Sequence, residues 1–126
     1  MTGGLLEQLY AAWLRLYRRS KYSNVRRVAS MSEVPKRLGS SIYLVGPDDA
    51  LKWVVMACPC RCGARIGVNL MRTRQPHWQI KLQSGTVTLR PSLWRSASTC
   101  GSHFFIERNK VRWVKQTNAE PKPLTN

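Results

Sequence analysis

Four cysteines and one histidine are the residues of this sequence whose types and spacing point most directly to chemistry. Cys58, Cys60 and Cys62 lie within one short segment, and Cys100 begins the sequence Cys-Gly-Ser-His that ends at His103. Thiolates and imidazoles are the ligands that zinc prefers, and a tetrahedral zinc site needs four of them. Isolated cysteines are commonly buried as small hydrophobic residues, but that interpretation does not account for this clustering. The sequence therefore predicts a site for one zinc ion.

The five donors are one more than the site requires. If Cys58, Cys60, Cys62 and Cys100 are the four ligands, His103 does not bind the metal and is available for another role. Three cysteines with His103 would be an equally ordinary structural set. We take the four cysteines as the ligands and the zinc as structural, because a closed site leaves no position for water. Residues i and i+4 of a strand lie about 13 Å apart, so the segment that holds the first three cysteines must turn.

Two kinds of hydrophobic period predict the elements that position these groups. Apolar residues at helical spacing from Leu5 to Tyr17 predict an amphipathic helix, which we expect to dock on the rest of the domain. After residue 40 the period changes to two, and Ser84-Gly85 and Arg108-Asn109 predict hairpin turns. The expected strands are Ile42–Val45, Leu51–Ala57, Ala64–Leu70, Trp78–Leu82, Thr86–Leu89, Phe104–Glu107 and Val111–Val114.

These patterns predict a mainly β (α+β) fold, namely a small antiparallel β-sheet domain stapled by one zinc and preceded by an N-terminal amphipathic helix. The chain has 126 residues, which is enough for one modest core. We expect the helix within residues 1–22, a connector over 23–40 that could end in a short edge strand, the zinc-containing β domain over 41–115 and a flexible polar tail over 116–126.

The net charge of +15 indicates an anionic partner without identifying one. The basic residues are spread along the chain, and no block of like charges marks a tail. The sequence contains no apolar run of about 20 residues, so we expect no membrane-spanning segment. The N-terminus lacks the order of charged, apolar and small residues that a secretory signal has. We therefore expect a cytoplasmic protein, where clustered cysteines more often bind metal than form disulfides.

Several motifs in the β region together resemble a small bacterial family long described only as a domain of unknown function. Its members are encoded beside bacterial ubiquitin-like conjugation genes. The resemblance covers about residues 41 to 115 and implies a zinc-stabilised, deubiquitinase-like serine peptidase whose partners are a ubiquitin-like modifier and its conjugates. The motifs are Cys58-Pro59-Cys60-Arg61-Cys62-Gly63, Pro76-x-Trp78, Leu89-Arg90-Pro91-Ser92, Cys100-Gly101-Ser102-His103-Phe104-Phe105-Ile106 and Trp113.

A serine peptidase needs a hydroxyl and a base within hydrogen-bond reach of it. His103 is the only histidine inside the motifs, and zinc bound at Cys100 would hold the loop that presents it. Ser92, at the end of an expected strand, is the nucleophile that we prefer. Ser102 is the alternative, but adjacent residues of an extended chain point to opposite faces. We expect Arg90 and Arg95, which flank Ser92, to bind a carboxylate of the substrate.

The acid that would orient the base is not fixed by the sequence. Glu107 follows His103 by four residues on the same face of a strand, and Asp48 and Asp49 lie in a turn. A Ser-His pair assisted by a backbone carbonyl is the other possibility.

A second function stays open from the sequence. A zinc-ribbon-like module without catalysis could bind nucleic acid, through Trp53, Trp78, Trp94 and Trp113 with neighbouring basic residues, or the conjugation machinery. If His103 were a zinc ligand, the Ser-His mechanism would fail.

Overall fold

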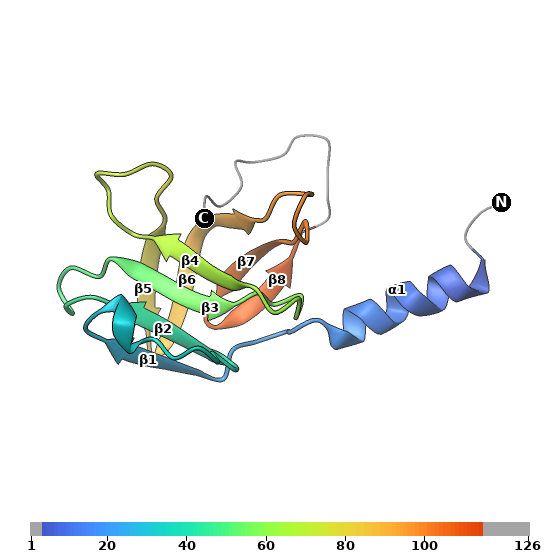
Figure 1. The fold of residues 1–126 in the computed structure, drawn as a ribbon, viewed down its shortest axis with the longest axis horizontal. Coiled ribbons are helices and arrows are strands. Elements are labelled where there is room, and N and C mark those ends of the chain that lie inside the picture. The colour runs from blue at the N-terminus through green and yellow to red at the C-terminus, as the bar shows by residue number, and fades with distance from the viewer. Residues whose placement is uncertain (1–3, 115–126) are drawn as a thin grey trace.

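Eight β-strands follow one α-helix in the computed structural model, which describes residues 4–114 (Figure 1). The expected tail over 116–126 lies outside the described residues. A 3-10 helix, Met31–Glu33, lies between the first two strands. The other elements are α1 Leu5–Tyr17, β1 Asn24–Val28, β2 Ser41–Val45, β3 Trp53–Ala57, β4 Arg65–Asn69, β5 Gln79–Gln83, β6 Thr86–Trp94, β7 His103–Glu107 and β8 Lys110–Trp113.

The strands form two four-stranded sheets, in the orders β1-β2-β3-β4 and β5-β6-β7-β8. Neighbouring strands are antiparallel except for β1 and β2, which pair in parallel. The mainly β fold is therefore confirmed, and the seven expected strands correspond to β2 through β8. The connector does contain an edge strand, β1, but it lies near the start of the connector rather than at its end. Its place was not predicted, because its arginines interrupt the apolar alternation.

The core lies between the two sheets. Apolar side chains alternate along the strands, so that one face of each sheet points toward the other. Val54 and Met56 of β3 belong to the same buried cluster as Leu89 of β6 and Phe104 of β7. Cys58 is buried in this cluster, and Cys60 and Cys100 pack against it. The expected metal ligands therefore lie at the border of the core.

The outer face of the first sheet is covered by the segment that follows β1. Val34 and Leu38 pack there against Tyr43, Val45 and Val55. Every residue of β2 is consequently buried, because β2 is enclosed on both faces.

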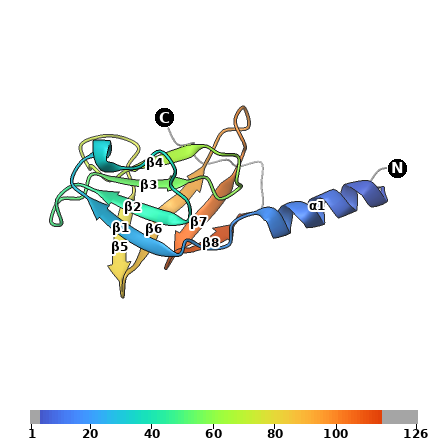
Figure 2. The same cartoon turned by 60° about the horizontal axis from the view of Figure 1, so that its bottom comes forward.

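The helix α1 extends away from both sheets, so the expectation that it docks on its own domain is wrong (Figures 1 and 2). Leu5, Leu6 and Leu9 are 69%, 81% and 55% exposed. The two sheets already bury each other's apolar faces, which leaves no open core for the helix. The chain is held to the domain just after the helix, where the N–H of Arg19 donates to the carbonyl of Pro59 at 2.7 Å. Among residues 4–114, no helix is long and apolar enough to cross a lipid bilayer.

Truncating Leu44, which is 0% exposed in β2, should lower the free energy of unfolding. We expect Leu44→Ala to cost about 2 to 5 kcal/mol through lost burial and the cavity that remains. Met31→Ala is the matched control, since Met31 is 40% exposed and its loss should cost little. Urea denaturation measures the free energy of unfolding of both variants. Equal stability of the two variants would contradict the placement of the core.

Candidate functional site

All four cysteines of the chain meet at one point of the structure. Their sulfur atoms lie within 4.8 Å of one another. The Sγ atom of Cys58 is 3.5 Å from that of Cys60 and 3.6 Å from that of Cys100. A tetrahedral site with metal–sulfur bonds of about 2.3 Å separates its sulfurs by about 3.8 Å. The cluster therefore fits a metal ion held by four thiolates.

The chain turns between the first three cysteines, as one shared ion requires. The N–H of Cys58 donates to the carbonyl of Ala64 at 2.9 Å, and the N–H of Arg61 donates back to the carbonyl of Cys58 at 3.0 Å. Arg61 and Gly63 adopt positive φ values of 69° and 90°, which reverse the chain. We call residues 58–63 the cysteine knuckle.

The cysteine knuckle also holds the end of α1. The guanidinium of Arg61 donates from Nε to the carbonyl of Tyr17 at 2.6 Å and lies over the Tyr17 ring at 5.6 Å. A cation at this place satisfies a carbonyl that a helix C-terminus leaves open. The direction in which α1 leaves the domain is therefore tied to the cysteine knuckle.

The thiols of the cluster have different pKa values. Burial raises the pKa of Cys58 and of Cys60 above that of an ordinary thiol. Burial also acts to raise the pKa of Cys100, but hydrogen bonds with Ser102 and the other thiols outweigh it and lower that pKa to about 7. A metal must therefore displace protons from the buried thiols when it binds. Its affinity should consequently weaken as the pH is lowered.

Ser102 belongs to this cluster. Its side chain is buried, and its hydroxyl lies 3.2 Å from the Sγ of Cys100 and 3.9 Å from that of Cys58. The carbonyl of Ser102 accepts a hydrogen bond from the N–H of Arg95 at 2.7 Å. The alternative nucleophile of the sequence analysis thus faces the sulfurs at the border of the core.

Ser92 lies beside His103. The Oγ of Ser92 is 2.9 Å from the Nε2 of His103, although eleven positions of sequence separate the two residues. Ser92 is on β6 and His103 begins β7, and both side chains are half-buried. The structure therefore brings the two predicted catalytic residues within hydrogen-bond reach, next to the loop that ends in Cys100.

An irregularity of the strand pair places this serine. Leu89 pairs with Ile106 and Leu93 pairs with Phe104, so residues 90–92 of β6 lie opposite Phe105 alone. Extra residues on one strand form a bulge, which re-aims side chains and is frequent beside active sites. Regular pairing resumes with Leu93 opposite Phe104 and continues with Trp94 opposite His103.

Trp78 supports the backbone of the serine from the other side. Its indole Nε1 donates to the carbonyl of Ser92 at 3.2 Å, and its side chain is buried. The sequence places Trp78 in the Pro-x-Trp motif and in a possible nucleic-acid face, and does not indicate this support of Ser92. A tryptophan directly before a strand could have indicated such a contact, because the indole N–H needs a hydrogen-bond partner once the ring is buried.

Arg90 and Glu107 lie in a charged network on the solvent side of the same sheet. The carboxylate of Glu107 accepts from Arg112 at 2.9 Å and from Arg90 at 3.1 Å. The guanidinium groups of Arg90 and Arg112 lie over the Phe105 ring, at 5.3 and 4.3 Å. The hydrogen bond from Arg112 lowers the pKa of Glu107, which keeps the carboxylate ionised.

Glu107 is poorly placed to orient His103. The two residues are four positions apart on β7, and their backbones are therefore about 13 Å apart. The carboxylate of Glu107 instead holds Arg90 and Arg112 beside Phe105.

Arg95 begins the loop between β6 and β7 and is half-buried. Its Nη1 is buried and has no hydrogen-bond partner among the described residues. This guanidinium therefore has an unpaired buried N–H group, three residues after Ser92 in the chain.

The tryptophans expected to form a nucleic-acid face are largely covered by protein. Trp78 belongs to the core between the sheets, and Trp53 packs on the outer face of the first sheet. Trp78 and Trp94 are buried, and Trp113 packs against Phe104 with 5.6 Å between ring centroids. Arg18 covers the Trp113 ring at 4.4 Å. Rings in these positions offer little surface on which a base could stack.

One comparison with known proteins finds a relative. A family model described as "Bacterial ubiquitination-like system serine protease (BubE)" matches residues 30–114, which include all four cysteines, Ser92 and His103. The match covers more than half of the chain and leaves α1 and β1 outside it. Comparisons with curated proteins and with solved structures find no match.

Cobalt(II) can report which residues bind the metal. We expect protein refolded with one cobalt ion to show the visible spectrum of a tetrahedral four-thiolate site, because the folded structure brings the four sulfurs together. Cys58→Ser should change this spectrum, whereas His103→Ala should leave it unchanged. A spectrum that shifts in His103→Ala would show a three-cysteine, one-histidine site and would contradict the assignment.

Proposed function

The chain belongs to the bacterial ubiquitination-like system serine proteases, and from this membership we propose that it is a deubiquitinase-like hydrolase. Its substrate is a ubiquitin-like modifier, which it cleaves from conjugates or from a precursor. Ser92 is the nucleophile and His103 is the general base. The observation that carries the proposal is the distance of 2.9 Å between Ser92 Oγ and His103 Nε2.

The two residues can carry out acyl transfer in two steps. In the first step His103 Nε2 takes the proton of Ser92 Oγ while the oxygen bonds to the scissile carbonyl carbon. The same nitrogen then gives this proton to the leaving amine as the C–N bond breaks. In the second step a water molecule loses a proton to His103 and attacks the acyl-serine ester. His103 then returns this proton to Ser92 Oγ as the ester C–O bond breaks and the carboxylate leaves. The base must therefore carry its resting proton on Nδ1.

Zinc is the metal that best suits the four thiolates, since soft sulfur ligands in a tetrahedral set select it. Cys58, Cys60, Cys62 and Cys100 would hold one structural ion, which would stabilise the fold. The chain between Cys100 and His103 is short, so fixing Cys100 also limits where the imidazole can lie. Ser102 assists through its contact with Sγ of Cys100.

Arg90 and Arg95 are the proposed substrate-binding residues. Both flank Ser92 in the chain, and Arg95 has an unused buried donor among the described residues. Arginine binds carboxylates and backbone carbonyls through several N–H groups at once. We place the reaction in the cytoplasm, where four free thiols persist in the reduced state.

A binding module without catalysis is the competing function. The burial of Trp78 and Trp94 argues against stacking on nucleic acid. The contact between Ser92 and His103 is what a peptidase needs and a binding module does not. We therefore favour the hydrolase.

Ser92→Ala should abolish cleavage of a fusion in which a ubiquitin-like modifier precedes a reporter protein. We expect the rate to fall about a thousandfold or more, because the nucleophile is lost. Gel electrophoresis of the products measures cleavage, and the metal content should not change. The matched control is Ser98→Ala, an exposed serine of the β6–β7 loop. Full activity of Ser92→Ala would remove Ser92 from the mechanism.

Removal of zinc should unfold the protein rather than only inhibit it. The four ligands come from the ends of both sheets, so the ion would stabilise the folded state directly. We expect a strong chelator to abolish the β-sheet circular dichroism together with activity, and zinc to restore both. A folded, metal-free and active protein would contradict the structural role.

A further inference from the structure

Strand β5 is an open edge beside the candidate site. It is the first strand of the order β5-β6-β7-β8, and four of its five residues are exposed. The opposite edge is partly occupied, since Lys21 bridges to Lys110 and the N–H of Val111 donates to the carbonyl of Ser20. An edge strand presents backbone N–H and C=O groups that can pair with another extended chain.

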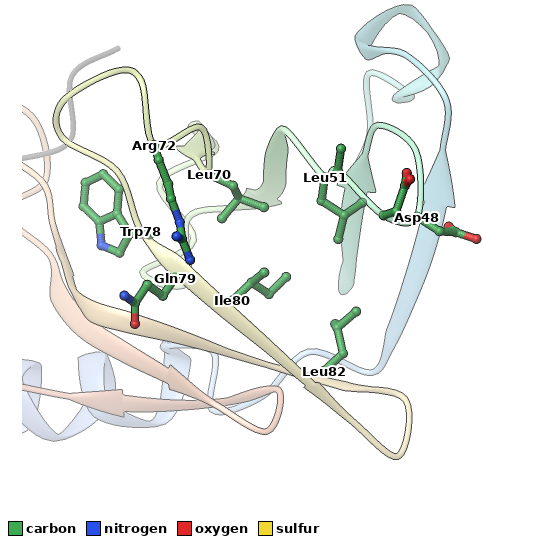
Figure 3. A pocket seen from close by; sticks show the side chains of 10 residues that line it. Asp48, Leu51, Leu70, Arg72, Trp78, Gln79, Ile80 and Leu82 are labelled. Carbon is green, nitrogen blue, oxygen red and sulfur yellow. The ribbon is translucent and has the colours of Figure 1, made fainter.

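A hollow lies on each side of this edge. The inner hollow, of about 580 Å³, lies between β5 and the first sheet. Figure 3 shows Leu51, Leu70, Ile80 and Leu82 pointing into it. Asp48, Asp49, Arg72 and Gln79 also line this hollow. It therefore combines a cluster of apolar side chains with charged and polar groups.

The outer hollow, of about 480 Å³, has a different character. Lys81, Arg90 and Arg108 line it together with glutamines of β5. Its one acidic residue, Glu107, already binds Arg90 and Arg112. The outer hollow therefore suits acidic side chains.

The two hollows define what could pair with β5. Side chains of a strand point alternately to its two faces. A strand added to β5 would place every second side chain toward the apolar side chains of the inner hollow and the others toward the basic side chains of the outer hollow. The edge thus fits an extended peptide in which apolar and acidic residues alternate.

The direction of pairing leads toward Ser92. Gln79 at the start of β5 pairs with Arg90, and Ser92 follows two residues later on β6. A peptide antiparallel to β5 would enter beside Gln83 and leave beside Gln79. Its C-terminal end would then point to the end of the sheet where Ser92 and His103 meet.

We propose that the open edge of β5 binds the C-terminal tail of the modifier as an added antiparallel strand, with alternating apolar and acidic side chains in the two hollows. This inference rests on the proposed function, because it takes the modifier as the substrate. Strand addition supplies affinity through the backbone, and the hollows supply specificity.

Amide hydrogen exchange on the Ser92→Ala protein tests the pairing. The probe is a synthetic peptide of alternating leucine and glutamate. At saturation we expect exchange in residues 79–83 to slow about tenfold or more. Exchange in β1, the outer strand of the other sheet, should not change. Unchanged exchange in β5, or slowing in β1 instead, would overturn the proposal.

A charge reversal tests the outer hollow. Lys81→Glu should weaken binding of the glutamate peptide about fivefold and favour a matched peptide with lysine in place of glutamate. Arg26→Glu, the same kind of change on exposed β1, is the control and should leave both affinities nearly unchanged. Fluorescence anisotropy with labelled peptides measures them. Equal effects of the two substitutions would contradict the assignment of the outer hollow.

The two proposals can fail separately. Protection of β5 by the peptide, in a protein that cleaves no modifier fusion, would refute the hydrolase and keep the binding edge. Cleavage that depends on Ser92, without protection of β5 and with the same KM in Lys81→Glu, would refute the binding edge and keep the hydrolase.

Discussion

The convergence of the four thiols is the constraint on which the rest of this structure depends. Three of them come from the cysteine knuckle after β3 of the first sheet, and the fourth comes from the loop that leads into β7 of the second sheet. One cluster therefore joins the two sheets at the end where the candidate site lies. Through Arg61 the cysteine knuckle also holds the end of α1. A small domain with a modest core gains much from such a link.

The candidate site is built on the rigid part of this frame. The bulge in β6 turns Ser92 toward His103, and the indole of Trp78 holds the carbonyl of the bulged residue. His103 is fixed by its place at the start of β7, close to Cys100. Neighbouring groups thus restrict both side chains, and the proposed catalysis would benefit because this geometry is present before a substrate binds.

Much of the fold could be predicted from the sequence, because apolar alternation follows directly from which face of a strand is buried. The same holds for the cysteine cluster, since few other arrangements explain three cysteines in one short segment. The position of the parallel strand β1 could not be predicted, because its arginines interrupt the apolar alternation that marks a strand. Its parallel pairing with β2 is also not visible in a linear pattern. The roles of Trp78 and Glu107 depend on distances between strands, which no linear pattern records. The exposed position of α1 was missed because an amphipathic pattern does not say what covers the apolar face.

Covalent labelling with a fluorophosphonate tests the central claim, that Ser92 is a nucleophile activated by His103. Such reagents phosphonylate a serine hydroxyl whose proton a neighbouring base can remove. Mass spectrometry of the digested protein should find one adduct, on Ser92, and no adduct in His103→Ala. An adduct on Ser102 instead, or a protein that cleaves its substrate yet takes up no label, would contradict the account.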